Sequence, residues 1–267
     1  MNESTKLQNS IDRLRKRLIL IVALFFIFVS LLLLKNINDS RKKSLIDYHL
    51  STQESFKNLM AHSLDTVRYA AYNTFYSSEA ISLRNATDIS PTQAAKYLRT
   101  LHALDSTNPF IHSIYLLNKS SNTVYTTNAG SSSFDQFDDQ SAFSPNNHLL
   151  KLRQLPNQVW VYTLQFTGIR DTDVSMVVNI DTYLFNRSLF RDTDATEFIY
   201  VPEQDTYFSS TGNAYLPIET LKFTSDNDSH FKTIDDDVYF YSYQPDYNLY
   251  IAKQVKSNSI INRFSSY

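Results

Sequence analysis

The feature that most constrains this chain is an uncharged stretch near its N-terminus. Residues 18–34 read "LILIVALFFIFVSLLLL", with no charge and a single hydroxyl group. A helix of this length rises about 25 Å at ~1.5 Å per residue, a little less than the ~30 Å hydrocarbon core of a bilayer. Arg17 and Lys35 bracket the stretch, and their long side chains can reach the membrane interfaces. The pattern predicts a transmembrane anchor at 18–34, preceded by a cytoplasmic tail at 1–17.

The sequence after this stretch favours an anchor over a cleaved signal peptide. The segment "KNINDSRKK" offers no small-x-small cleavage site, and a chain without cysteine cannot be a lipoprotein. Five basic residues precede the stretch and four follow it closely, which slightly favours a cytoplasmic N-terminus. We therefore expect a single-pass protein of the cell membrane, in contact with the lipid bilayer, with its main domain extracellular. The absence of cysteine also suits the exposed surface of a Gram-positive bacterium.

Charge and composition argue against several functions. Residues 1–17 hold five of the 25 basic and two of the 27 acidic residues, which leaves a net charge of −5 on the rest. A mildly acidic domain is not expected to bind nucleic acid, which requires a basic surface. The three glycines are too far apart for a nucleotide-binding loop, and no two histidines have the helical spacing of a zinc hydrolase. The Asp-rich segments lack the central glycine of a calcium loop. We expect no catalytic site, metal or cofactor, and therefore no enzyme.

A long helix is expected to follow the anchor, at residues 40–78. Its apolar residues recur at helical spacing, and no glycine or proline interrupts it. Such a stripe suits either packing against the chain's own core or pairing with a second copy, and both can hold at once. We interpret the segment as a stalk helix that also supports a homodimer. The stripe consists of Phe56, Met60, Leu64, Val67, Ala71 and Phe75.

The next segment, 79–182, is expected to form a membrane-distal module. Ser90, Pro91 and Gln93 have the pattern of a capping box at the start of a helix, which Asn108 and Pro109 end. The hydrophobic period then changes to two, which predicts strands at 110–117, 123–127, 158–166 and 173–180. The polar segment 128–148 between them is expected to be a long loop, and a short helix capped by an aspartate is expected at 181–190.

The same order is expected to repeat in a smaller membrane-proximal module at 183–256. Strands are predicted at 196–201, 205–210, 230–234, 237–244 and 248–255, separated by turn-forming residues. A last helix is expected at 257–267. Each sheet must bury one face, and the helices are its covers. The predicted fold class is α+β, with an N-terminal transmembrane helix, a stalk helix and two PAS-like antiparallel sheet modules.

This order of elements resembles the double Cache (dCache) sensor regions of bacterial receptors. The resemblance rests on the anchor, the long helix, "NPFIHSIYLLNKSSNTVYTT", "MVVNIDTYLF" and "FIYVPEQDTYFSSTG", and covers most of residues 18–264. The most similar regions are those of Gram-positive membrane-anchored AraC-type regulators and of two-component sensor histidine kinases. The resemblance implies an extracellular ligand-sensing region of a signal-transduction protein. The alternative is a cell-surface interaction or accessory protein without signalling output.

The sequence departs from the family in two respects. Receptors of this kind continue into a second transmembrane helix and a cytoplasmic effector, whereas this chain stops at "NSIINRFSSY". We therefore expect a truncated receptor or a chain that signals through another protein. Amino-acid-binding dCache domains also have an arginine two residues before a Trp-Tyr pair. Here Gln158 takes the arginine position and Val161 replaces the tyrosine, which argues against amino-acid recognition by that motif.

A candidate ligand site follows from the aromatic residues of the distal strands. Alternation places Trp160 and Tyr162 on one face of their strand, where an indole N–H and a phenol O–H suit a sugar-like or organic ligand. The alternative is that both rings fill the core beneath the second helix. Charged residues in the following turn are expected at the rim of the pocket. The predicted ligand-binding residues are Tyr115, Tyr125, Trp160, Tyr162, Arg170 and Asp171.

Overall fold

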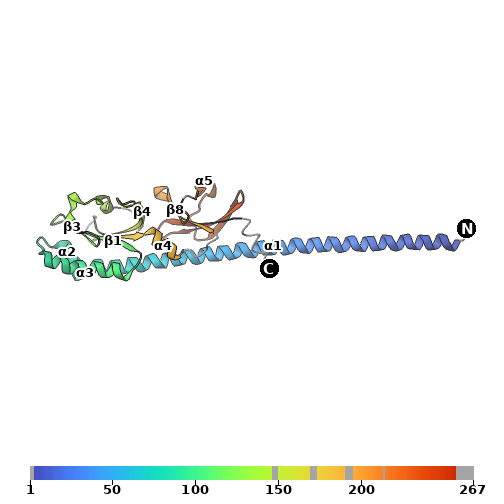
Figure 1. The fold of residues 1–267 in the computed structure, drawn as a ribbon, viewed down its shortest axis with the longest axis horizontal. Coiled ribbons are helices and arrows are strands. Elements are labelled where there is room, and N and C mark those ends of the chain that lie inside the picture. The colour runs from blue at the N-terminus through green and yellow to red at the C-terminus, as the bar shows by residue number, and fades with distance from the viewer. Residues whose placement is uncertain (1–2, 146–149, 169–172, 190–194, 213, 257–267) are drawn as a thin grey trace. The chain divides into compact units, whose positions relative to one another are not determined.

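The structure is a computed structural model of the 267-residue chain, shown in Figure 1. It describes residues 3–145, 150–168, 173–189, 195–212 and 214–256. The chain divides into two compact units, residues 1–49 and 50–267. The predicted C-terminal helix at 257–267 lies outside the described residues.

The first unit is part of helix α1, which runs from Glu3 to Phe75. Within the described residues, α1 is the one helix long and apolar enough to cross a membrane. Most of its apolar side chains between residues 18 and 34 are exposed. These are the properties that the sequence predicts for an anchor.

The described part of the second unit contains the end of α1 and four shorter α-helices. Ser90 caps α3 with its side chain and forms the predicted capping box with Gln93, and Pro91 begins the helix. The Asp181 carboxylate accepts a hydrogen bond from the backbone N–H of Leu184 and so caps α4. The short helices are α2 (Ser78–Asn85), α3 (Pro91–Thr107), α4 (Thr182–Leu189) and α5 (Ile218–Leu221).

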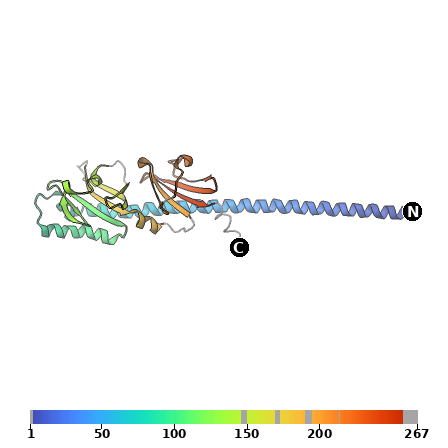
Figure 2. The ribbon, with the colours of Figure 1, turned by 45° about the horizontal axis from the view of Figure 1, so that its top comes forward.

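The distal sheet has six antiparallel strands in the order β3-β2-β1-β6-β5-β4. A turn with Gly130 at φ = 80° leads from β2 into β3, and the short 3-10 helices η1 (Phe134–Gln136) and η2 (Gln140–Phe143) follow. In Figures 1 and 2, α2 and α3 lie along one side of this sheet. The strands are β1 (Ile111–Asn118), β2 (Thr123–Thr126), β3 (Gly130–Ser133), β4 (Lys151–Gln154), β5 (Trp160–Thr167) and β6 (Val174–Asp181).

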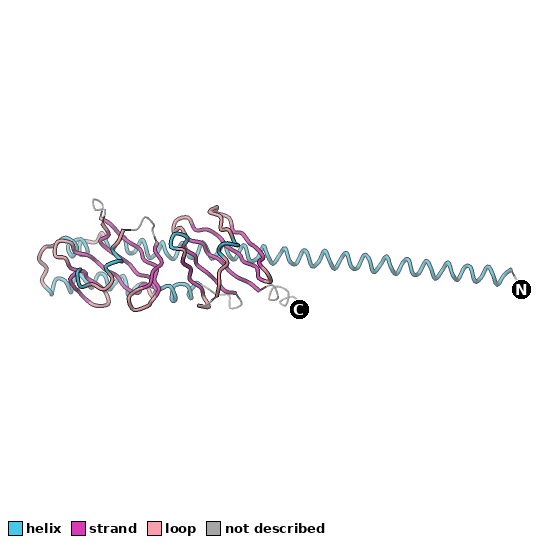
Figure 3. The backbone as a smooth tube through the Cα atoms, turned by 90° about the horizontal axis from the view of Figure 1, so that it is seen from above, coloured by secondary structure: helices cyan, strands magenta, loops and turns pink. Residues whose placement is uncertain are grey.

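The proximal sheet has five antiparallel strands in the order β8-β7-β11-β10-β9. Figure 3 shows the two sheets as separate groups of strands. The 3-10 helix η3 (Pro202–Gln204) connects the first two strands of the proximal sheet. These strands are β7 (Ala195–Val201), β8 (Thr206–Ser209), β9 (Ser229–Ile234), β10 (Asp237–Gln244) and β11 (Leu249–Lys256).

One hydrophobic core joins α1 to both sheets. Met60, Leu64 and Phe75 of α1 are fully buried in it, together with Ile114 of β1 and Ile251 of β11. The apolar stripe of the stalk helix is therefore used within the chain. The α+β fold class, with its long N-terminal helix and two antiparallel sheets, is confirmed.

Candidate functional site

The candidate site is a pocket in the distal module with a volume of about 320 Å³. It is bounded by β1, by the turn from β2 into β3, by the segment after η1 and by the turn between β4 and β5. Ligand pockets in proteins range from about 300 to 1,000 Å³, so this pocket is the size of a small organic molecule. The residues that line the pocket include His112, Tyr115, Ser132, Phe137, Asp138 and Asp139.

The pocket lies on the face of the distal sheet that the helices do not cover. Ile114 and Leu116 of β1 belong to the core cluster that includes α1, whereas Tyr115 and Leu117 belong to a separate cluster. Successive side chains of a strand point to opposite faces, so the two clusters mark the two faces of the sheet. Helices fill one face, and the loop that carries η1 and η2 partly covers the other.

A buried polar network lies behind the pocket. Arg153 of β4 donates from Nε to Oγ1 of Thr163 at 2.8 Å and from Nη2 to Oδ1 of Asn179 at 2.8 Å. Its Nη1 donates to Oδ1 of Asp139 at 2.6 Å. Asn179 in turn donates from Nδ2 to Oγ of Ser113 at 2.9 Å. The network therefore connects strands β4, β5, β6 and β1 to the loop that carries Asp139.

Asp139 is the point where this network meets the pocket. Its side chain is 5% exposed, and its Oδ1 atom is held by Arg153. Its Oδ2 atom has no hydrogen-bond partner among the described residues. Burial of a carboxylate oxygen without a donor is unfavourable, and the ion pair with Arg153 offsets part of that cost.

Aromatic rings form the apolar part of the pocket. Tyr115 and Phe137 meet edge to face, with ring centroids 5.0 Å apart, and Phe143 packs behind Phe137 at 6.2 Å. Burial raises the pKa of the Tyr115 hydroxyl above its ordinary value. The pocket combines a ring surface with a few polar groups, as small-molecule sites generally do.

Of the four predicted ligand-binding residues that lie in the described part of the chain, the structure places only Tyr115 at this pocket. Tyr125 and Tyr162 are buried in the core that includes the helices, on the opposite face of the sheet. The Tyr162 hydroxyl donates to Oδ1 of Asn186 in α4 at 3.2 Å, and burial raises its pKa. Trp160 begins β5 with 41% of its surface exposed and does not line the pocket. Arg170 and Asp171 lie outside the described residues.

The expected aromatic ligand face of β5 is thus not the face that meets the pocket. Tyr162 shares its face with Ile180 and Leu152, its neighbours on β6 and β4, and this face packs against helices. Val161 pairs with Arg153 on the other face. The alternative interpretation, in which the ring fills the core, therefore applies to Tyr162.

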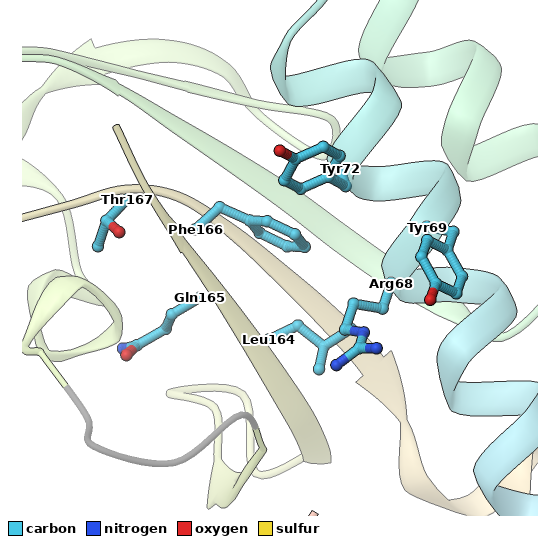
Figure 4. A pocket seen from close by; sticks show the side chains of 7 residues that line it. All are labelled: Arg68, Tyr69, Tyr72, Leu164, Gln165, Phe166 and Thr167. Carbon is cyan, nitrogen blue, oxygen red and sulfur yellow. The ribbon is translucent and has the colours of Figure 1, made fainter. Parts of the chain in front are cut away.

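A second hollow, of about 400 Å³, lies between α1 and β5 (Figure 4). Arg68 approaches it from α1 but is already paired with Asp65 at 3.0 Å. Gln165 approaches it from β5, and its amide donates to the carbonyl oxygens of Ala142 and Ser144. Arg68 and Gln165 therefore already have partners within the chain, which makes this hollow a weaker candidate for ligand recognition. The hollow is lined by Arg68, Tyr69, Tyr72, Leu164, Gln165, Phe166 and Thr167.

The corresponding face of the proximal sheet is filled by the chain's own rings. Phe223 stacks on Tyr200 with centroids 5.4 Å apart and packs on Tyr250 at 4.6 Å. Tyr243 lies 4.8 Å from Tyr250 on the other side. Leu221 of α5 belongs to the same cluster. This face of the proximal sheet is therefore packed by rings, whereas the same face of the distal sheet has a pocket.

The residues that sequence reasoning missed are those of the polar network. Asp139 lies in a segment that reads as a polar loop, and Arg153 lies in "KLRQ", which reads as half-exposed. The sequence carries no local signal for this network, because Arg153 lies between Leu152 and Gln154 and its partners come from other segments.

Comparison with known proteins supports the fold and gives no closer relative. No family model matches the sequence, and no curated protein matches it. Among solved structures, a sensory box/GGDEF family protein domain from Vibrio parahaemolyticus matches with a TM-score of 0.60 and 11% identity, over 83% of this chain and 99% of that one. The sensory domain of the Campylobacter jejuni chemoreceptor Tlp3 matches with a TM-score of 0.54 and 12% identity, over 84% and 99%.

A third similar structure is the extracellular domain of the histidine kinase vpHK1S-Z8. It matches with a TM-score of 0.54 and 12% identity, over 84% of this chain and 94% of that one. The chain shares the fold of these sensory domains. At this level of identity the likeness describes the arrangement of helices and sheets, in agreement with the expected Cache-like architecture.

Proposed function

We propose that this chain is the extracellular ligand-sensing region of a membrane-anchored bacterial signal-transduction protein. Residues 18–34 serve as the anchor, the N-terminus is cytoplasmic, and a small ligand binds in the distal pocket. The shared fold with sensory domains of chemoreceptors and a histidine kinase supports this proposal. No catalytic step is assigned to the chain.

The observation that carries the proposal is the difference between the two modules. The distal sheet has a pocket of about 320 Å³ with a buried carboxylate at its wall, whereas stacked rings fill the same face of the proximal sheet. A preformed cavity with polar and aromatic walls can admit a small molecule without first displacing packed side chains. Tlp3 has been solved with L-valine bound, so this fold can hold a small ligand.

Strand β4 connects the distal pocket to the proximal module, so that ligand binding can affect that module. Arg153 holds Asp139 at the pocket, and the preceding residue, Leu152, is bound by Gln204 of η3. The Gln204 side chain accepts from the Leu152 N–H at 2.9 Å and donates to the Leu152 carbonyl oxygen at 2.6 Å. A ligand that repositions Asp139 would bias the position of β4 and of the module that holds it.

The output of the sensor belongs to the same proposal. We assign the signal to a cytoplasmic effector of the histidine-kinase or AraC-type regulator class in a Gram-positive bacterium, as the sequence resemblance implies. The receptor acts as a homodimer, because two copies anchored in one membrane gain effective concentration. A shift between two arrangements of the dimer carries ligand energy across the membrane.

The test is the melting temperature of the full chain in detergent, measured against sugars, organic acids, amino acids, amines and peptides. A ligand that binds the folded state raises the melting temperature, and the increase grows with the logarithm of the ligand concentration once that concentration exceeds Kd. Ser132→Trp places an indole in the pocket, whereas Ser133→Trp makes the same change one residue further along β3, outside the pocket.

We expect at least one compound to raise the melting temperature of the wild type and of Ser133→Trp but not of Ser132→Trp. Failure of every compound, or an equal response of both variants, would contradict binding in the distal pocket.

A further inference from the structure

We propose that the basic residues just beyond the anchor form a collar that binds the anionic phosphate headgroups of the membrane. The collar consists of Lys35, Arg41, Lys42 and Lys43. This inference rests on the membrane anchor of the proposed function, and it concerns a surface other than the distal pocket. The chain then gathers anionic lipids around this end of its anchor, and its surroundings depend on the charge of the bilayer.

The helix continues without a break from the anchor into the collar. α1 runs from Glu3 to Phe75, and the side chains of residues 35–43 are all exposed. A helix over residues 18–34 rises about 25 Å, roughly 5 Å less than the hydrocarbon core, so the polar residues at its ends are drawn toward the headgroups. Lys35 then lies at the edge of the hydrocarbon, and residues 41–43 follow it by about 9–12 Å of helix. Their long side chains can reach back to the headgroup layer, which is about 5–8 Å thick.

The lysines of the collar are not neutralised within the chain. Lys35, Lys42 and Lys43 form no ion pair with any residue that the structure describes, although Asp39 lies in the same stretch of helix. Their ammonium groups are therefore available to phosphate oxygens, which are the acceptors that a membrane surface offers in large number.

Charge is also divided sharply along the sequence. The segment 35–43 has four basic residues and one acidic residue, a net charge of +3. With this segment and residues 1–17 set aside, 16 basic and 24 acidic residues remain, a net charge of −8 for residues 44–267. An anionic bilayer attracts the collar and repels the acidic domain, so the collar is the part of the chain after the anchor that such a surface selects.

The arrangement of the collar favours a membrane over a protein partner. Successive residues of a helix are about 100° apart, so the three cations at 41–43 point to different sides of α1. A protein that binds one face of a helix meets residues spaced three or four apart. A membrane surface surrounds the helix that crosses it and can use cations on every side. The geometry therefore suits lipid headgroups.

The experiment measures which lipids surround the full-length chain after reconstitution. The vesicles contain equal parts of phosphatidylcholine and phosphatidylglycerol, with a trace of either lipid carrying a nitroxide on its acyl chain. Electron paramagnetic resonance gives the ratio of the association constants of the two labelled lipids with the protein. The measurement is made at low and at high salt, because exposed charges are screened by salt.

The collar variant combines Arg41→Gln, Lys42→Gln and Lys43→Gln. Glutamine has nearly the helix propensity of lysine and arginine, and the three side chains are exposed, so the helix is preserved. We expect the wild type to prefer phosphatidylglycerol and the collar variant to lose this preference by at least about twofold at low salt. The difference should disappear at high salt. Each single substitution should cause a similar part of the loss.

The matched control combines Lys96→Gln, Arg99→Gln and Lys222→Gln. These changes also remove three positive charges from exposed positions, but far along the sequence from the anchor. The control should keep the lipid preference of the wild type, since its cations do not belong to the collar.

Equal lipid preference of the wild type and the collar variant would overturn the inference. It would leave the proposed function standing, because the ligand test at Ser132 does not involve residues 41–43. A loss confined to one of the three single variants would also overturn the inference, since it would indicate a partner on one face of α1. If the wild type does not float with the vesicles in a density gradient, the anchor itself is contradicted, and the proposed membrane receptor fails together with the collar.

Discussion

Arg153 is the residue on which the distal pocket most depends. Its replacement by methionine keeps the length of the side chain but leaves the buried Asp139 carboxylate without its partner. Removing one member of a buried ion pair costs about 3–5 kcal/mol, because the remaining charge is not solvated. We expect Arg153→Met to lower the free energy of unfolding by that amount in denaturant titrations.

The matched control is Lys119→Met. Lys119 pairs with Asp173 at 2.8 Å, but both side chains are well exposed, and such pairs contribute about 0–1 kcal/mol. Equal losses of stability in the two variants would show that the Arg153–Asp139 pair stabilises the fold no more than an exposed ion pair, and would contradict its burial.

Tyr162 and Trp160 are predicted to respond differently to truncation. Tyr162 is fully buried beneath α4, so Tyr162→Ala should cost roughly 3–5 kcal/mol. Trp160 keeps 41% of its surface exposed, so Trp160→Ala should cost less than half as much. If either variant remains folded, its affinity for a ligand of the distal pocket should be unchanged. A larger loss for Trp160→Ala in thermal unfolding would contradict this placement.

At the residue scale, the sequence predicted which side chains share a face but not where that face points. Alternation correctly groups Trp160 with Tyr162 on β5, and it cannot tell which face meets the helices. The helices that bury Tyr162 come from distant segments, including α4. Arg153 finds Asp139, Thr163 and Asn179 only after four strands have paired, so local patterns could not reveal the network.

At the element scale, the side chain of Gln204 supplies hydrogen bonds to the backbone of the edge strand β4. Edge strands present unpaired backbone groups, and here the Gln204 amide binds both backbone groups of Leu152. We expect Gln204→Ala to speed hydrogen exchange of the Leu152 N–H, because its acceptor is lost. Gln154→Ala is the control, since this side chain bonds within the β4–β5 hairpin. Unchanged exchange of the Leu152 N–H in Gln204→Ala would indicate that β4 does not couple the two modules.

The elements that the sequence predicted are those with a strong local signal. Helix α3 has a complete capping box, and β10 and β11 have long apolar alternation, so all three appear where expected. Helices α2 and α5 and the strands β3 and β4 were not predicted, and of these α5, β3 and β4 have only four residues each. Strand β3, "GSSS", has almost no intrinsic preference for a strand and forms because β2 offers it a pairing edge.

At the scale of the whole molecule, the proposed homodimer has to use a different surface of α1 from the apolar stripe. Met60 is fully buried in the chain's own core, whereas the neighbouring Leu59 is 43% exposed. The chain has no cysteine, so single-cysteine variants have no background. We expect Leu59→Cys to form a cross-linked dimer in membranes under mild oxidation and Met60→Cys not to. Equal cross-linking at both positions would indicate that the helix is not packed as described.

The most direct test of the central claim is where a bound ligand protects the chain. Hydrogen exchange of the full chain should be followed by mass spectrometry, with and without a compound that raises its melting temperature. The account predicts slower exchange at residues 126–139 and 155–157, which border the distal pocket, and no primary protection at 216–223 of the proximal module. Protection confined to the proximal module, or to the hollow between α1 and β5, would contradict a distal ligand site.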